Sequence, residues 1–160
     1  MKKLAFLLAL CLLLAPLCAC AEESEQPTTY TFTASGVQIA IDAEAAPILS
    51  ALGEWSAFDE SPSCAFEGMD KVYTYNAYEI ETYCQKNVDY VAKVRLLDDS
   101  VKTAKGIAIG AKKADVTAAY GTPTTESETE LTYQASGMRL QFLLRNGIVS
   151  GIQYLKNEKN

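Results

Sequence analysis

Few side chains in this 160-residue chain could do chemistry, and histidine is missing altogether. Without imidazole the chain lacks the commonest general base near neutral pH and the commonest transition-metal ligand. The serine and cysteine triads that depend on imidazole are excluded as well. Asp98 and Asp99 form an adjacent acidic pair, but they follow an expected strand, where acids ordinarily face solvent or begin a turn. We therefore expect no catalytic residue, no metal site and no cofactor, and a protein that is not an enzyme.

Cysteines are the other reactive groups, and three of the five, Cys11, Cys18 and Cys20, lie in the first 20 residues. The remaining two, Cys64 and Cys84, are predicted to form a disulfide, because two cysteines in an exported chain most often pair. The alternative is two separate buried thiols. A zinc site is not expected from two thiols in a chain without histidine.

The N-terminus has the pattern of an export signal. Residues 1–21 read MKKLAFLLALCLLLAPLCACA, in which two lysines precede an apolar run. This run is shorter than the ~20 residues of an ordinary membrane-spanning helix, so a removable signal peptide is the better interpretation. Residues 17–20 (LCAC) resemble a bacterial lipobox, whose last cysteine receives diacylglycerol and becomes the new N-terminus. This predicts a lipoprotein signal peptide at 1–20 and lipid attachment at Cys20.

The predicted anchor sets the expected location. A flexible tether at 21–29, polar and containing Pro27, would join a lipid on the outer surface of the bacterial cell membrane to the folded part. The alternative is ordinary signal peptidase cleavage after Ala21, which would leave a secreted or periplasmic protein. Losing Lys2 and Lys3 with the leader changes the net charge from −6 to −8. An acidic protein repels phosphate backbones, so no nucleic-acid partner is expected.

An internal duplication is indicated by self-comparison. Residues 39–43 (IAIDA) match 107–111 (IAIGA) at an offset of 68, and Gly53 and Gly121 follow as expected helix stops. Each copy also has two apolar residues four apart on one helical face: Ile48 and Leu52, then Val116 and Tyr120. The helix stop of the second copy is followed by a proline, as is usual after a helix.

A second register, at an offset of 58, aligns Thr74-Tyr75 with Thr132-Tyr133. In the second copy the alternation predicts strands at about 130–135, 137–144 and 148–155, with Asn146-Gly147 as a tight hairpin turn. The chain is thus divided into a first α+β repeat at 30–98 and a second at 99–160. The expected fold class is α+β, with two tandem helix-plus-antiparallel-meander repeats that form one continuous sheet with helices on one face.

The second copy resembles the domain shared by the SmpA/OmlA outer-membrane assembly lipoproteins and the β-lactamase inhibitory protein group. The matching residues are Ile107, Gly110, Val116, Tyr120, Gly121, Pro123 and Gly147. In the first copy, Asp42 stands in place of the glycine and Trp55 in place of the proline. The resemblance implies an antiparallel sheet whose concave face engages a protein partner. It transfers fold better than function, because the shared motif is structural.

The solvent-facing side of the sheet is the best candidate for binding. Alternation along the strands puts a mixture of charged, amide and tyrosine side chains on that side, which suits protein recognition: Glu79, Glu81, Tyr83, Lys93, Arg95, Arg139, Gln141 and Gln153. The alternative is that these residues only solvate the sheet. Trp55 and Phe58 are interpreted either as exposed anchors or as a lid over the helix, and we favour the lid because most aromatic residues are at least half buried.

The expected function is that of a non-enzymatic, lipid-anchored extracytoplasmic protein that binds a protein or peptide. The alternative is an envelope-assembly or structural lipoprotein that acts within a larger complex.

Overall fold

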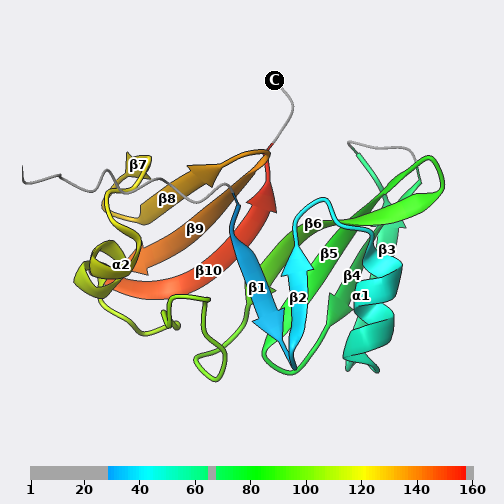
Figure 1. Cartoon of the computed structure of the whole chain (residues 1–160), viewed down its shortest axis with the longest axis horizontal. Coiled ribbons are helices and arrows are strands. Elements are labelled where there is room, and N and C mark those ends of the chain that lie inside the picture. The colour runs from blue at the N-terminus through cyan, green and yellow to red at the C-terminus, as the bar shows by residue number, and fades with distance from the viewer. Residues whose placement is uncertain (1–28, 65–67, 158–160) are drawn as a thin grey trace, which may run out of the picture.

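The computed structural model describes residues 29–64 and 68–157, which are mostly β-structure (Figure 1). There are two helices of eight residues each in this part of the chain, α1 (Ala45–Leu52) and α2 (Lys113–Tyr120). Within the described residues, no helix is long and apolar enough to cross a membrane. The strands are β1 (Thr31–Ala34), β2 (Val37–Ala40), β3 (Ala57–Pro62), β4 (Met69–Thr74), β5 (Tyr78–Gln85), β6 (Val88–Leu96), β7 (Thr125–Glu126), β8 (Glu130–Ala135), β9 (Met138–Arg145) and β10 (Ile148–Lys156).

Eight of these strands form a single antiparallel sheet in the order β3-β4-β5-β6-β10-β9-β8-β7, and β1 and β2 form a separate two-stranded sheet. The centre of the large sheet is the pairing of β6 with β10, in which Arg95 lies opposite Gln153 and Lys93 opposite Leu155. Strands more than 50 residues apart in sequence therefore meet at the middle of the sheet (Figure 1).

The predicted fold class, α+β with tandem helix-plus-meander repeats, is wrong. Strands account for 51% of the structure, and a separate β1–β2 sheet stands beside the eight-stranded one. The helices stay short because Gly53 and Gly121 end each of them after about two turns. Residues 57–62 form an additional strand, β3, whereas 107–111 belong to no strand and include a turn. The N–H of Ile107 in that segment donates to Thr103 Oγ1 at 3.1 Å instead of joining a strand. The internal duplication itself stays a prediction.

Local signals in the C-terminal part are confirmed. The three strands expected there are β8, β9 and β10, within two residues of the predicted bounds. Asn146 and Gly147 form the turn between the last two, with φ of +53° and +74°. Gly53 and Gly121 end their helices at φ of +80° and +78°, a region that glycine occupies most readily.

The core lies between one face of the large sheet and the elements that cover it. Ile80, Val94, Leu140 and Ile152 project from the sheet into a single cluster of buried side chains. The same cluster includes Phe32 from the β1–β2 sheet, as well as residues from both helices. Figure 1 shows α1 and the β1–β2 hairpin in front of the sheet, with α2 at its other end. This arrangement leaves the opposite side of the sheet, here called the outer face, for the alternate residues of each strand.

Candidate protein-binding face

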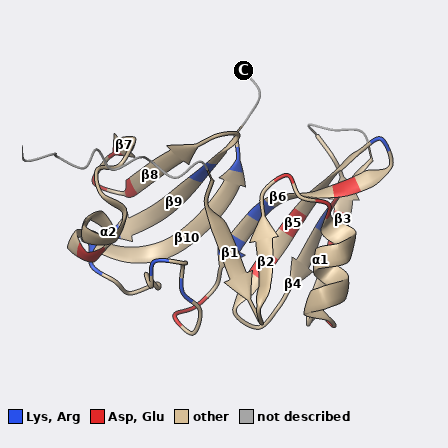
Figure 2. Cartoon of the chain, in the orientation of Figure 1, with Lys and Arg blue, Asp and Glu red and all other residues tan. Residues whose placement is uncertain are grey.

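Two rows of side chains run across the strands on the outer face. The first row crosses four neighbouring strands, and each of its residues is paired with the next. In order, they are Glu79 of β5, Arg95 of β6, Gln153 of β10 and Gln141 of β9. The second row joins Glu81, Lys93, Leu155 and Arg139 across the same four strands. All the predicted face residues except Tyr83 therefore lie close together and are partly or fully exposed. Figure 2 shows the basic positions on β6, β9 and β10 and the acidic ones on β5.

Charges in these rows largely neutralise one another. Arg95 Nε lies 2.7 Å from Glu79 Oε1, and this hydrogen bond holds the pKa of the Arg95 guanidinium above its usual value. Lys93 forms an ion pair with Glu81 in the next row. Such solvent-accessible pairs contribute about 0–1 kcal/mol to folding. Their main effect is to present fixed, alternating charges on a surface that partner residues could match.

The β9–β10 end of the face is rich in amide groups. Gln153 Nε2 donates to Gln141 Oε1 at 3.4 Å. Arg139 makes one long hydrogen bond, from Nη1 to the carbonyl oxygen of Lys156 at 3.5 Å. These groups have donors and acceptors left for a partner, and the surface changes from ion pairs on β5 and β6 to amide groups and Arg139, which has no ion pair among the described residues, on β10 and β9.

Tyr83 is buried, which corrects its predicted exposure. Its side chain is 5% exposed because Lys156 Nζ lies 4.7 Å above the ring and the Tyr90 ring stacks on it with centroids 5.7 Å apart. The Tyr83 hydroxyl donates to Asp42 Oδ1 at 2.8 Å and accepts from Lys156 Nζ at 3.1 Å. Desolvation is the main reason that the pKa of the Tyr83 hydroxyl is raised. This cluster joins the end of β10 to the loop after β2 and buries Tyr83.

A depression lies beside Arg95 on the outer face, and sequence reasoning missed it. Its volume is about 280 Å³, and it has a mixed lining in which Leu97, Ile109 and Leu143 lie next to Arg95 and Gln153. The lack of a side chain at Gly151 leaves room for this depression, because a Cβ atom there would lie 3.3 Å from Leu143 Cδ1. Alternation could have revealed part of it, since Leu143 has the same parity as Gln141 along β9.

Trp55 and Phe58 are exposed, so the favoured lid interpretation is wrong. Their exposed fractions are 45% and 42%, and both contact Tyr73, with ring centroids 5.0 and 5.1 Å from it. Residues 57–62 pair with β4 as an edge strand, so Phe58 packs beside the sheet rather than over α1.

The remaining chemical groups have structural explanations. Cys64 and Cys84 are both free thiols, so the predicted disulfide is not formed in this structure. Cys64 follows β3, which ends at Pro62, and Cys84 lies on β5. Strand β4 lies between these two strands in the sheet.

Asp98 makes contacts that explain it without a catalytic role. Its Oδ1 accepts hydrogen bonds from the hydroxyl and the backbone N–H of Ser100, which lower the pKa of Asp98 and hold a local turn. Within 29–64 and 68–157, no cluster of acidic or thiol side chains is arranged to hold a metal ion.

The predicted signal peptide, the lipid-attachment residue Cys20 and nearly all of the tether lie outside the described residues. No family model, no curated protein and no solved structure matches this chain.

Proposed function

We propose that this chain is a lipid-anchored exported protein that binds a partner protein or peptide through the outer face of its sheet. The observation that carries the proposal is the alignment of mostly polar side chains in two rows across β5, β6, β10 and β9, on the side of the sheet that faces away from the core. A binding surface needs fixed polar groups together with apolar contacts. The rows supply the fixed groups, and Leu155 of the second row and the leucines in the depression beside Arg95 supply apolar contacts.

The resemblance to the inhibitory protein group favours the same face, because those proteins engage their partner through the sheet. The predicted lipid on Cys20 would hold this surface close to the membrane, where an envelope or surface protein is the natural partner class. Nucleic acid has no place in this proposal, because the chain is acidic overall.

The test is site-specific photo-crosslinking in cells that express the full chain. A photoreactive amino acid in place of Gln141 should give one discrete cross-linked species, and the same amino acid in place of Ala114, which is exposed on α2, should not. Cross-linking from position 114 alone, or none from position 141, would contradict the proposal.

Charge reversal provides the matched experiment. The double variant Arg95→Glu and Arg139→Glu should abolish the cross-link from position 141, because both side chains flank the proposed contact. Lys102→Glu is the control, since Lys102 is exposed in the linker and makes no ion pair among the described residues. If the double variant and the control behave alike, the charges of the outer face do not recognise the partner.

The anchor is tested separately by Cys20→Ser. We expect this variant to leave the membrane fraction and to appear in the soluble exported fraction. A membrane-bound variant would defeat the lipid-anchor proposal and would leave the binding proposal untouched.

A further inference from the structure

The only tryptophan of the chain, Trp55, stands between two hollows at the end of α1. The first hollow, about 630 Å³, is lined by Leu49, Gly53 and Tyr73. The second, about 440 Å³, is lined by Leu52, Tyr75 and Tyr78 among others. Trp55 and Glu54 line both, so one indole and one carboxylate are shared by two adjoining depressions, here called the Trp55 hollows.

These hollows lie away from the outer face. Phe58 of β3 is opposite Tyr73 of β4, which is opposite Ile80 of β5. Ile80 points into the core, so Phe58 and Tyr73 belong to the side of the sheet that α1 covers. A ligand in the Trp55 hollows would therefore use a surface distinct from the one proposed above.

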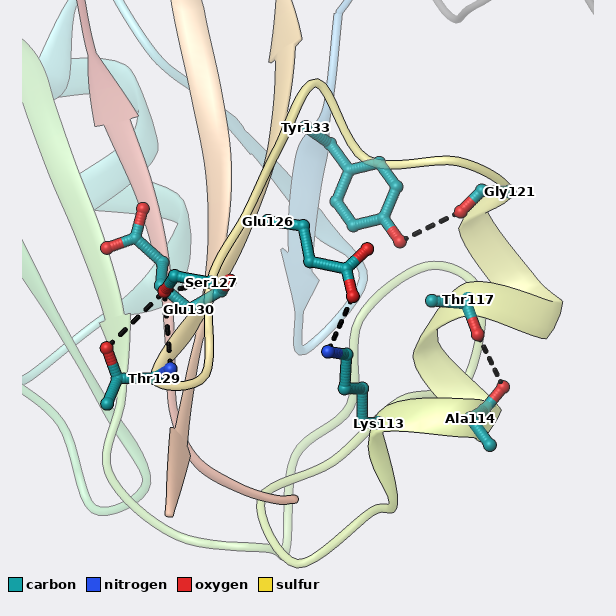
Figure 3. A network of polar contacts seen from close by, with 9 residues as sticks. All are labelled: Lys113, Ala114, Thr117, Gly121, Glu126, Ser127, Thr129, Glu130 and Tyr133. Carbon is teal, nitrogen blue, oxygen red and sulfur yellow. Dashed lines mark hydrogen bonds and ion pairs between the residues drawn. The ribbon is translucent and has the colours of Figure 1, made fainter. Parts of the chain in front are cut away.

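A buried tyrosine pair lines the second hollow. The Tyr75 ring is 8% exposed and stacks on Tyr78 with centroids 4.9 Å apart, and its buried hydroxyl has no hydrogen-bond partner among the described residues. Figure 3 shows the contrasting case of Tyr133, whose hydroxyl donates to the carbonyl oxygen of Gly121 at 3.0 Å. Because the Tyr75 hydroxyl is itself inaccessible, the pair gives the second hollow an aromatic wall rather than a hydrogen-bond donor.

The surroundings of the Trp55 hollows are acidic. Between Lys3 and Lys71 the sequence contains no lysine or arginine. The described part of that stretch carries six acids: Asp42, Glu44, Glu54, Asp59, Glu60 and Asp70. Lys71, at the end of the stretch, is held in an ion pair with Asp89 at 2.7 Å. Asp42 is likewise paired, with Lys156, and Glu54 is the acid that lines the Trp55 hollows, whose described lining contains no lysine or arginine. Figure 2 shows acidic positions at both ends of α1, so the local potential attracts cations.

We propose that the Trp55 hollows bind a basic segment of a partner polypeptide. An arginine or lysine side chain of that segment lies against the exposed indole of Trp55 and forms an ion pair with Glu54. Tryptophan is the best of the aromatic residues for cation–π contact, and its neighbours Phe58 and Tyr73 hold it in place.

The single tryptophan provides a direct readout, because emission excited at long wavelength comes from Trp55 alone. The probe is N-acetyl-triarginine amide, titrated into the purified exported part of the chain. We expect a saturable change in Trp55 emission that weakens as salt is raised, and no change with N-acetyl-triglutamine amide. A response to a neutral trisaccharide such as cellotriose without one to the arginine peptide would overturn the proposal and make the site a carbohydrate site.

One variant tests the named ion pair. Glu54→Gln should weaken binding of the arginine peptide about three- to fivefold at low salt, as expected for loss of one solvent-accessible ion pair. Two controls should leave the affinity unchanged: Tyr75→Phe, because the buried hydroxyl does not reach the segment, and Glu128→Gln, an exposed acid near β7 without an ion pair in the described residues. Equal affinities for Glu54→Gln and the two controls would refute the assigned ion pair.

Discussion

The ends of α1 and α2 share one backbone conformation but differ in the residues that follow. Gly53 and Gly121 have nearly the same φ and ψ, +80° and −152° against +78° and −154°. Three residues on, the N–H of Ser56 donates to the Thr74 carbonyl just as the N–H of Thr124 donates to that of Thr132, each at 2.8 Å. The residue two positions after each glycine differs. It is Trp55, which is exposed, after α1, and Pro123, which is half-buried, after α2.

This difference extends to the tyrosine beneath each helix end. Tyr133 packs against Tyr120 and Phe142, at centroid distances of 5.3 and 6.0 Å, and its hydroxyl reaches Gly121 (Figure 3). Tyr75 stacks on Tyr78 instead, and its buried hydroxyl has no acceptor in the described part of the chain. The α2 end is therefore closed by internal contacts, whereas the α1 end has the same backbone with hollows beside it.

The largest expected effect comes from alkaline pH, which should unfold both regions. Burial raises the pKa of Tyr78, near the α1 end, and of Tyr133, near the α2 end, from 10 to about 12. Because the folded state holds these protons more tightly than the unfolded chain, their stabilisation is complete below pH 10 and is lost as pH rises from 10 to 12. Circular dichroism between pH 8 and 12.5 measures the transition.

Single variants separate the contributions to this transition. Tyr78→Phe and Tyr133→Phe should each move the midpoint of alkaline unfolding upward, since the residue that resists ionisation is removed. Unfolding that begins well below pH 10, or midpoints unaffected by both substitutions, would show that these tyrosines do not govern the transition.

Replacing either helix-ending glycine should cause the next largest loss. Gly53→Ala and Gly121→Ala put a side chain on a backbone conformation nearly restricted to glycine, at a cost of about 1–3 kcal/mol. A Cβ atom would meet nothing within 4 Å at either position, so the cost is conformational and should be similar in the two variants. Urea denaturation gives both free energies of unfolding. A difference above about 1 kcal/mol would mean that the two helix ends are not equivalent in backbone strain.

Removing one hydroxyl from each tyrosine should distinguish the regions. Tyr133→Phe removes the hydrogen bond to Gly121 and should lower the free energy of unfolding at pH 7 by about 0.5–1.5 kcal/mol. Tyr75→Phe removes a hydroxyl without a partner and should be neutral or stabilising. Equal losses in the two variants would show that Tyr75 has a bond in solution, and the contrast between the helix ends would disappear.

The sequence predicts best where local signals are strong and worst where contacts are distant. Alternation and the Asn146-Gly147 turn were enough to locate β8, β9 and β10 and to put the polar residues of β9 on one face. Strand β3 escaped prediction because all six of its residues are exposed, which leaves no buried–exposed alternation to detect. It forms because β4 offers a partner for its backbone.

The candidate site shows the same limit. Parity along β5 correctly put Glu79 and Glu81 on the outer face, yet the same rule failed for Tyr83. The residues that cover Tyr83 are Asp42, 41 positions away, and Lys156, 73 positions away. Nothing in the local pattern marks such contacts, because they depend on how β10 ends beside the loop after β2. The hollows beside Trp55 are equally a product of tertiary packing.

The smallest expected effect concerns an ion pair that only the α2 end has. Lys113 Nζ lies 2.6 Å from Glu126 Oε1 and ties α2 to β7 (Figure 3), whereas α1 contains no charged residue. Since the two side chains are 35% and 50% exposed, Glu126→Gln should lower the free energy of unfolding by less than about 1 kcal/mol at low salt. The loss should vanish near 1 M salt, where the screening length is about 3 Å. Glu128→Gln, measured by the same denaturation experiment, should show no loss at either salt concentration. If the loss in free energy of unfolding persists at 1 M salt, the charge of Glu126 does not stabilise the α2 end.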